Sequence, residues 1–292
     1  MSTRFVCPAC KKPDKTFTLY ISTETGQALH YSVGKCNRLS KCAYHYTPKQ
    51  YFIDNNVEFT KPIFCNTPTP LKQQPTSYVP HAVFLASLKH YGKNNFVQFL
   101  NALFSADVVT SLLQRYYIGT AKYWQGATVF WQVDVQHKIH TGKLMLYNVS
   151  TGKRVKQPYK HIQWAHKIMG QTHFNLQQCL FGEHLLAIHN AKHVALVESE
   201  KTAIIASVYW PQYVWLAVGS LTNLTAQKCK VLKGKTVTLF PDLNGFEKWN
   251  AKAKELSAIC KITVSDLLER QATPQQKQQG LDLADYLVGC DR

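Results

Sequence analysis

The sequence predicts an α/β protein whose last third forms a parallel sheet with flanking helices. From residue 193 onward, short apolar runs alternate with segments of helical character. This alternation is typical of strand–helix–strand units, whose strands are parallel and whose crossovers are right-handed. A stretch with two-residue alternation precedes it, and closely spaced cysteines lie on strand-like segments near the N-terminus. We therefore expect a small α+β subdomain and a β-ribbon before the parallel sheet.

The composition is that of a globular protein with a strongly basic surface. The chain has 292 residues, 45% of them hydrophobic, which suffices for one large or two ordinary domains. A net charge of +17 favours a polyanionic partner such as nucleic acid. No apolar run approaches the ~20 residues of a membrane span, and the first seven residues lack a secretory signal. We expect a cytoplasmic protein with reduced cysteines and no membrane partner.

Four cysteines near the N-terminus have the spacing of a metal site. Cys7 and Cys10 form a CxxC pair, and Cys36 and Cys42 follow a stretch with strand-like alternation. Four thiolates on two turns give the tetrahedral sulfur set that Zn²⁺ prefers. The second pair is spaced more widely than usual, so His45 is an alternative to Cys36. A redox-active CxxC is the competing interpretation, but no βαβ pattern surrounds it. We expect a zinc ribbon that needs the metal to fold.

Composition also places the boundaries of the next parts. Residues 61–80 hold five prolines with several Thr and Gln, which is typical of a linker after a zinc-ribbon module of residues 1–60. Residues 81–190 combine two segments of helical periodicity with an alternating stretch. That stretch predicts a small antiparallel sheet with turns at His140–Gly142 and Ser150–Gly152.

The predicted antiparallel sheet is basic. Its basic residues include Lys138, His140, Lys143, Lys153, Arg154 and Lys156. They could follow a phosphate backbone, and a solvated strand face explains them equally well. We take Lys143, Lys153, Arg154 and Lys156 as candidate nucleic-acid or phosphate contacts. We expect Trp124 and Trp131 in the core rather than as platforms for base stacking.

Acidic residues follow the strands of the predicted parallel sheet. Glu198 and Glu200 end the first apolar run, and Asp242 ends a later one. Because the carboxyl ends of parallel strands meet at one edge of a sheet, these carboxylates can converge in space. Convergent carboxylates bind hard cations such as Mg²⁺ and, through them, phosphates. The alternative is that they are ordinary acids at loop starts.

The same segments carry a resemblance to a known family. VESEKTAIIAS and FPDLNGFEKW resemble the Toprim domain of bacterial and phage primases, topoisomerases and some nucleases, in which a Glu-bearing loop faces an Asp-x-Asp. GLDLADYL resembles the acidic segment after the Toprim core of phage-type primases, and CPACKKPDKTFTLYI resembles the zinc-binding start of primases. The order of the parts is that of a primase, and it also resembles an uncharacterised family of Toprim-like proteins of mobile elements. The Toprim-like domain would span residues 191–292.

The resemblance implies roles for individual residues. Glu198 matches the catalytic glutamate, a general acid or base and metal contact, and Asp242 matches the first aspartate of Asp-x-Asp, a Mg²⁺ ligand. Asp282 and Asp285 would complete the acidic set. Lys201 is placed for a phosphate, although a solvated lysine in the first turn of a helix is an equal alternative.

Two departures from the family pattern weaken the catalytic inference. Ser199 stands where the family usually has glycine, and Asn244 replaces the second aspartate. A neutral amide oxygen holds a hard cation less tightly than a carboxylate does. Asn244 stays a candidate Mg²⁺ ligand, and Glu200 or Asp285 could supply the missing charge.

The resemblance implies a DNA primase-like protein. It would carry out Mg²⁺- or Mn²⁺-dependent nucleotidyl transfer on a single-stranded DNA template, with nucleotides as substrates, in the replication of a mobile element or phage. A replicative helicase would be a further partner. The alternative keeps the nucleic-acid contact without the chemistry, as a weakly active or inactive accessory protein of replication or mobilisation. A third hypothesis uses the same acids to cleave phosphodiesters.

Overall fold

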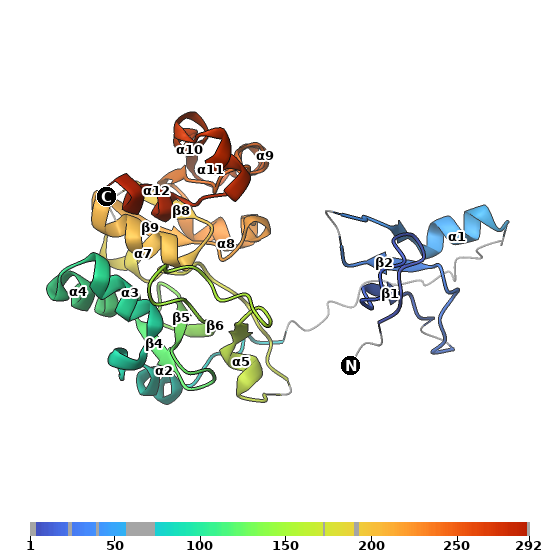
Figure 1. The fold of residues 1–292 in the computed structure, drawn as a ribbon, viewed down its shortest axis with the longest axis horizontal. Coiled ribbons are helices and arrows are strands. Elements are labelled where there is room, and N and C mark those ends of the chain that lie inside the picture. The colour runs from blue at the N-terminus through green and yellow to red at the C-terminus, as the bar shows by residue number, and fades with distance from the viewer. Residues whose placement is uncertain are drawn as a thin grey trace. The chain divides into compact units, whose positions relative to one another are not determined.

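The structure, a computed structural model, describes residues 4–22, 25–38, 41–56, 74–171, 173–189 and 193–290, except the side chains of Gln279 and Cys290. The chain divides into two compact units between residues 72 and 73 (Figure 1). The predicted linker lies outside the described residues up to residue 73. Among the described helices, none has both the length and the apolar character that a membrane span requires.

The N-terminal unit is a three-stranded antiparallel ribbon. Its strands are β1 (Phe17–Leu19), β2 (Gly34–Cys36) and β3 (His45–Tyr46), paired in that order. The helix α1 (Pro48–Asp54) follows them. A Cβ at Gly34 would lie 2.3 Å from the carbonyl oxygen of Thr18, so the close approach of β1 and β2 requires glycine there.

The second unit begins with helices that pack on an antiparallel sheet. The helices are α2 (His81–Ser87), the 3₁₀ turn η1 (Tyr91–Lys93), α3 (Asn95–Leu103) and α4 (Ala106–Tyr116). The strands are β4 (Ile118–Ala121), β5 (Ala127–Val133), β6 (Ile139–Met145) and β7 (Ile162–Trp164), paired in that order. Two short helices follow, α5 (Ala165–Ile168) and α6 (Leu185–Ile188).

One of the two predicted turns in this sheet is wrong. His140–Gly142 lies inside β6, and the chain reverses instead after Asp134, whose Oδ1 accepts from the backbone N–H groups of Gln136 and Lys138. Gly142 is present for packing, because a Cβ there would lie 2.6 Å from Val129 and 2.7 Å from the ring of Trp131. The glycine that suggested a turn is therefore needed because side chains of the neighbouring strand pack closely against it.

The predicted turn at Ser150–Gly152 is confirmed. The Asn148 side chain accepts from the backbone N–H groups of Ser150 and Thr151 at 3.0 and 2.9 Å. The turn brings the basic segment that follows it back toward the sheet, where Arg154 and Tyr147 form an isolated antiparallel β-bridge.

The last part of the chain is a parallel sheet with helices between its strands. The strands are β8 (His193–Val197), β9 (Tyr213–Ala217), β10 (Thr236–Leu239) and β11 (Lys261–Val264), in the spatial order β11-β10-β8-β9. The intervening elements are α7 (Glu200–Tyr209), η2 (Leu221–Asn223), α8 (Ala226–Cys229), η3 (Lys230–Leu232) and α9 (Phe246–Leu256). The terminal helices are α10 (Leu267–Gln271), α11 (Pro274–Gln279) and α12 (Leu283–Cys290). The predicted α/β fold class, with flanking helices and a cysteine-bearing ribbon, is confirmed.

The strand order places a ligand crevice at β8. The chain leaves β8 toward β9 on one side and returns to β10 on the other. In open α/β sheets, such a reversal of strand order opens a crevice outside the carboxyl ends of the strands. The residues that follow β8 and β10 therefore leave the sheet side by side.

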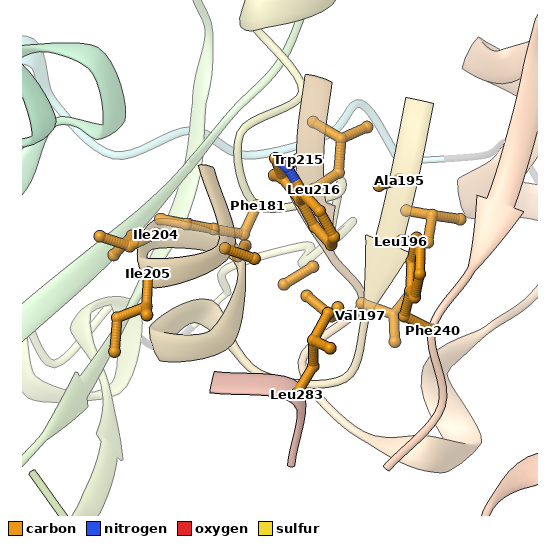
Figure 2. Packing of buried hydrophobic residues seen from close by; sticks show 14 of the residues in the cluster. Phe181, Ala195, Leu196, Val197, Ile204, Ile205, Trp215, Leu216, Phe240 and Leu283 are labelled. Atoms are coloured by element: carbon orange, nitrogen blue, oxygen red, sulfur yellow. The ribbon is translucent and has the colours of Figure 1, made fainter. Parts of the chain in front are cut away.

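A continuous hydrophobic core joins the two sheets of the second unit. Figure 2 shows Phe181 and the α7 residues Ile204 and Ile205 within the same cluster of buried side chains as Trp215 and Leu283. The ring of Tyr116, at the end of α4, stacks on Phe181 at 5.5 Å, and its hydroxyl donates to the carbonyl oxygen of Trp215. The predicted domain boundary at residue 190 therefore crosses a shared core, and it stays a proposal.

Candidate functional site

The four predicted cysteine ligands converge in the N-terminal unit. The Sγ atoms of Cys7, Cys10, Cys36 and Cys42 all lie within 4.8 Å of one another, and those of Cys7 and Cys42 are 3.8 Å apart. Zn–S bonds of about 2.3 Å in a tetrahedral site separate the sulfurs by about 3.8 Å, so this set fits zinc. The structure places Cys36, and not His45, with the other three, since His45 Nε2 is 2.7 Å from the Tyr20 hydroxyl.

The electrostatics of the four thiols favour a bound cation. The backbone N–H of Lys12 lowers the pKa of Cys10 to about 6, and that of Arg38 lowers the pKa of Cys36. The backbone N–H of Tyr44 would lower the pKa of Cys42 too, but burial and the neighbouring cysteines raise it to about 11. Four sulfurs this close cannot all ionise without a positive ion between them, so a structural zinc ion fits the ribbon.

In the second unit, Glu198 and Asp242 line one cleft of about 740 Å³ at the carboxyl ends of the parallel strands. They follow β8 and β10, which pair directly through Leu196 and Leu239. The backbone N–H groups of Asp242 and Leu221 donate to the Glu198 carboxylate. A Cβ at Gly245 would lie 2.8 Å from the Asp242 carbonyl oxygen and 3.3 Å from Glu198 Oε1, so glycine lets α9 begin close to both acids.

Both acids are held in surroundings that disfavour their negative charge. Burial raises the pKa of Asp242 to about 8, and the charges of Glu198 and Asp282 add to the rise, while Lys201 opposes it. Burial also raises the pKa of Glu198, against the two backbone donors. Within the described part of the chain, Asp242 Oδ1 is buried and has no hydrogen-bond partner. A divalent cation would supply both the missing partner and the missing charge, so these two residues fit Mg²⁺ or Mn²⁺.

The remaining predicted acids are paired with a lysine. Lys201 Nζ, in the first turn of α7, lies 3.2 Å from Asp282 Oδ2 and 3.0 Å from Asp285 Oδ1. Burial would lower the pKa of Lys201, but the two carboxylates outweigh burial and raise it. Asp282 Oδ1 accepts from the backbone N–H of Asp285 at the start of α12, which fixes both acids at the cleft. Lys201 is therefore not a solvated surface lysine.

Lys143 lies in the same cleft, and not on a solvated strand face. Its side chain is buried, and Nζ donates to Glu200 Oε2 and to the Gly219 carbonyl oxygen, each at 3.0 Å. Glu200 is only 1% exposed, and its second oxygen has no hydrogen-bond partner among the described residues. The buried pair joins β6 to the first turn of α7, and so links the antiparallel sheet to the acidic cleft.

Asn244 does not join the other candidate ligands. Its side chain is exposed, and Nδ2 donates to the carbonyl oxygen of Lys277 at 2.9 Å, while its backbone N–H donates to Glu269. Its backbone is left-handed, with φ 68°, a conformation that asparagine tolerates better than most residues. The amide is thus used to attach the loop to the segment around α11.

The acids of the cleft do not form a compact ligand cluster. Apart from the four cysteines, no three described His, Cys, Asp or Glu side chains bring ligand atoms within 4.8 Å of one another. Lys143 and Lys201 separate the acids and neutralise part of their charge. A divalent ion here would be held by few carboxylates and would keep water or substrate oxygens, as is usual for Mg²⁺.

A basic edge completes the cleft. Lys153, Arg154 and Lys156 line it from the segment after the Ser150–Gly152 turn, and all three are exposed. Exposed lysine and arginine side chains beside buried acids suit phosphates that bridge a metal ion and the protein. The cleft thus combines nine of the predicted acidic and basic site residues.

The sequence did not predict the buried pairing of Glu200 with Lys143, and Glu200 was considered only as a possible replacement for the missing carboxylate at position 244. The available signal was its position at the first residue of α7, directly after the Ser199 cap, whose hydroxyl accepts from Thr202 N–H at 3.2 Å. A capped helix start at the end of a parallel strand faces the crevice, and an acid there faces it as well.

Comparison with known families and structures gives several similarities. A family model described as a domain of unknown function (DUF6371) matches residues 94–243, and a zinc β-ribbon finger model matches residues 1–57. No curated protein matches the sequence. The chain is similar to the primase fragment of the bacteriophage T7 primase-helicase protein, with 14% identity, 58% of this chain and 69% of that chain covered, and a TM-score of 0.36.

Two further solved structures are similar to this chain. One is the DnaG catalytic core, with 12% identity, 72% of this chain and 81% of that chain covered, and a TM-score of 0.44. The other is the DnaG primase catalytic domain bound to single-stranded DNA, with 13% identity, 72% and 82% covered, and a TM-score of 0.42.

Proposed function

This chain belongs to the family described as a domain of unknown function (DUF6371), and we propose that it is a primase-like nucleotidyltransferase. It would act on a single-stranded DNA template in the replication of a mobile element or phage. One observation carries the proposal. Glu198 and Asp242 share a cleft, both have a raised pKa, and Asp242 has a buried oxygen that no described residue hydrogen-bonds. These are acids placed to receive a divalent cation.

The residues of the cleft have distinct roles in this proposal. A bound Mg²⁺ or Mn²⁺ ion would offset charge on the nucleotide phosphates. Glu198 and Asp242 would hold that ion, and by the resemblance to the family Glu198 would also accept the proton of the attacking hydroxyl. Asp282 and Asp285 hold Lys201 Nζ at the cleft, where it contacts a phosphate.

The template would reach the cleft along its basic edge. Lys153, Arg154 and Lys156 are exposed there and suit the phosphates of a single strand. By the resemblance to primases, the zinc ribbon would hold or read the template, and a replicative helicase would be a partner.

The second candidate function is a replication or mobilisation accessory protein without catalysis. Two observations favour it. Asn244 is not among the described residues that line the cleft, and its Nδ2 donates to the carbonyl oxygen of Lys277 instead. Lys143 pairs with Glu200, and Lys201 pairs with Asp282 and Asp285, so that the two lysines offset part of the charge of these acids. A cleft of this kind can bind phosphates through lysines alone.

The test is incubation with single-stranded DNA and nucleotides in the presence of Mg²⁺ or Mn²⁺. Short labelled oligonucleotides identify a primase, and a shortened template identifies a nuclease. Neither product, with salt-sensitive binding retained, identifies the accessory protein.

Two variants locate the activity. Glu198→Gln and Asp242→Asn should each lower synthesis by about 10²-fold or more while template binding is retained. The matched control is Glu255→Gln, an exposed acid of α9 paired with Lys252, which should retain full synthesis. Full activity of Glu198→Gln would show that the chemistry takes place elsewhere.

A further inference from the structure

A second pocket lies on the opposite face of the antiparallel sheet. It measures about 960 Å³, and the described residues that line it are all different from those of the acidic cleft. Successive residues of a strand point to opposite faces. Leu144 therefore lines this pocket, while its neighbours Lys143 and Met145 line the acidic cleft. The pocket floor is apolar and includes Val129 and Trp131.

The mouth of the pocket is positively charged. Lys89, His90 and Lys93 line it from the turn around η1, and Lys122 lines it from the end of β4. None of the described lining residues is acidic. Across the described part of the chain, none of the three exposed lysines has an ion-pair partner. The pocket therefore offers three free cations beside an apolar floor.

The two segments that carry the lysines are fastened together. Asn94 is fully buried, and its Nδ2 donates to the Gly119 carbonyl oxygen at 3.0 Å, while its Oδ1 accepts from Thr128 Oγ1 at 2.7 Å. His90 holds a left-handed backbone, with φ 59°. A strained residue at a pocket mouth needs such support from its surroundings. The positive charges are thus held as one group.

Aromatic side chains stand beside these charges. Tyr123 is 49% exposed and meets Trp124 edge to face at 4.7 Å. Trp124 also meets His161 edge to face at 5.1 Å. Tyr123 is therefore an accessible ring next to Lys122, supported from behind by two further rings.

We propose that this pocket binds a nucleotide. The base lies on the apolar floor beside Tyr123 and Trp124, and the phosphates contact Lys89, Lys93 and Lys122. A ligand site of this size, mostly apolar with a few grouped polar side chains, is typical of small-molecule and cofactor pockets. A nucleotide carries several negative charges next to one flat, largely apolar base. The grouped lysines suit its phosphates, and the apolar floor suits its base. An acidic peptide spreads its charges along an extended backbone and matches the pocket less well.

The nucleotide has two sources, a free nucleotide or one residue of a single-stranded nucleic acid. Two probes distinguish them, ATP and a fluorescein-labelled oligonucleotide of twelve thymidines, dT12. Both are titrated against the zinc-loaded full chain in buffer without Mg²⁺ or Mn²⁺, so that no such cation holds either probe at the acidic cleft. The result is independent of the proposed function, because no synthesis is measured.

The test variant is Lys93→Glu with Lys122→Glu. Its control is Lys233→Glu with Lys261→Glu, two exposed lysines of the same unit outside both pockets, which gives the same net charge. We expect the test variant to bind at least about tenfold more weakly than the control. The slope of log affinity for dT12 against log salt should fall by about 1.4, or about 0.7 for each lost phosphate contact.

A second variant tests the ring. Tyr123→Ala should weaken binding by about tenfold and Tyr123→Phe should restore it, because the ring and not the hydroxyl contacts the base. If the control binds ATP and the test variant does not, the ligand is a free nucleotide. If only dT12 shows this difference between control and test variant, the ligand is a single strand. Equal binding of both probes by test variant and control would overturn the proposal. So would wild-type binding of a labelled peptide of six aspartates and a phenylalanine when neither nucleotide probe binds.

Discussion

Replacement of Asp242 by asparagine should stabilise the protein when no metal is present. Burial raises the pKa of this carboxyl from its ordinary value of 3.8 to about 8. A group whose pKa is raised by folding contributes stability that is fully present below its unfolded pKa, is lost progressively as the pH rises toward its folded pKa, and is fully lost above it. At pH 7 the wild-type protein has therefore lost about 4 kcal/mol of the stability that it had below pH 4.

Asparagine keeps the shape of the side chain and cannot ionise. We expect Asp242→Asn to be more stable than the wild type by about 2–4 kcal/mol at pH 7 in EDTA, with a Tm about 5–15 °C higher. The difference should shrink to less than about 1 kcal/mol near pH 4, close to the ordinary pKa of 3.8, where the folded wild-type carboxyl is protonated. Excess Mg²⁺ should stabilise the wild type and leave Asp242→Asn unchanged, because only the wild type has the carboxylate that binds the ion.

The assay is urea and thermal unfolding, followed by circular dichroism, across pH 4 to 8, with EDTA or with Mg²⁺. Glu255→Gln serves as the control, since it removes an exposed acid whose loss should change stability by less than about 0.5 kcal/mol. Two results would refute the reasoning. One is a variant less stable than the wild type at pH 7 in EDTA. The other is equal stabilisation of both proteins by Mg²⁺.

Three other outcomes are expected. Lys143→Met leaves Glu200 buried without its partner and should lower the free energy of unfolding in urea by about 3–5 kcal/mol. The double variant Lys143→Met with Glu200→Gln should recover more than half of that loss. A double variant as unstable as the single one contradicts the buried pair. Removal of zinc by a chelator, or Cys10→Ser, should unfold the N-terminal unit and leave residues 74–290 folded, with a single unfolding transition of their own. A ribbon whose NMR spectrum stays dispersed without zinc argues against a structural metal. Asn244→Asp should cost about 1 kcal/mol through loss of its hydrogen bond to Lys277 and should leave the Mn²⁺ affinity unchanged; tighter Mn²⁺ binding in calorimetry would show that residue 244 reaches the ion.

Local patterns were sufficient to predict the parallel sheet, its edge of acids and the cysteine cluster. Apolar runs such as that of β8 alternate with helical segments. Glu198 directly follows β8 and Asp242 comes three residues after the end of β10, so their convergence depends on the two strands being parallel. The CxxC spacing of Cys7 and Cys10 predicts a turn that brings two thiols together, and that turn also depends only on neighbouring residues.

Features that depend on contacts between distant segments could not be predicted. Lys143 and Glu200 are 57 residues apart and meet only because β6 packs against the start of α7. The orientation of Asn244 is set by Lys277, a residue of α11. Gly142 carries a turn signal in the sequence, yet it is needed because the side chain of Trp131 passes over it. In each case the partner, and not the local pattern, decides the role of the residue.

The most direct measurement is the position of a divalent ion in crystals of the full chain soaked with Mn²⁺. We predict an anomalous peak between the carboxylates of Glu198 and Asp242, at ligand distances of about 2.1 Å, with no contact to Asn244. A cleft without a peak, in crystals whose four cysteines hold zinc, would contradict a metal-dependent site. A peak that Asp242 does not contact would contradict it equally.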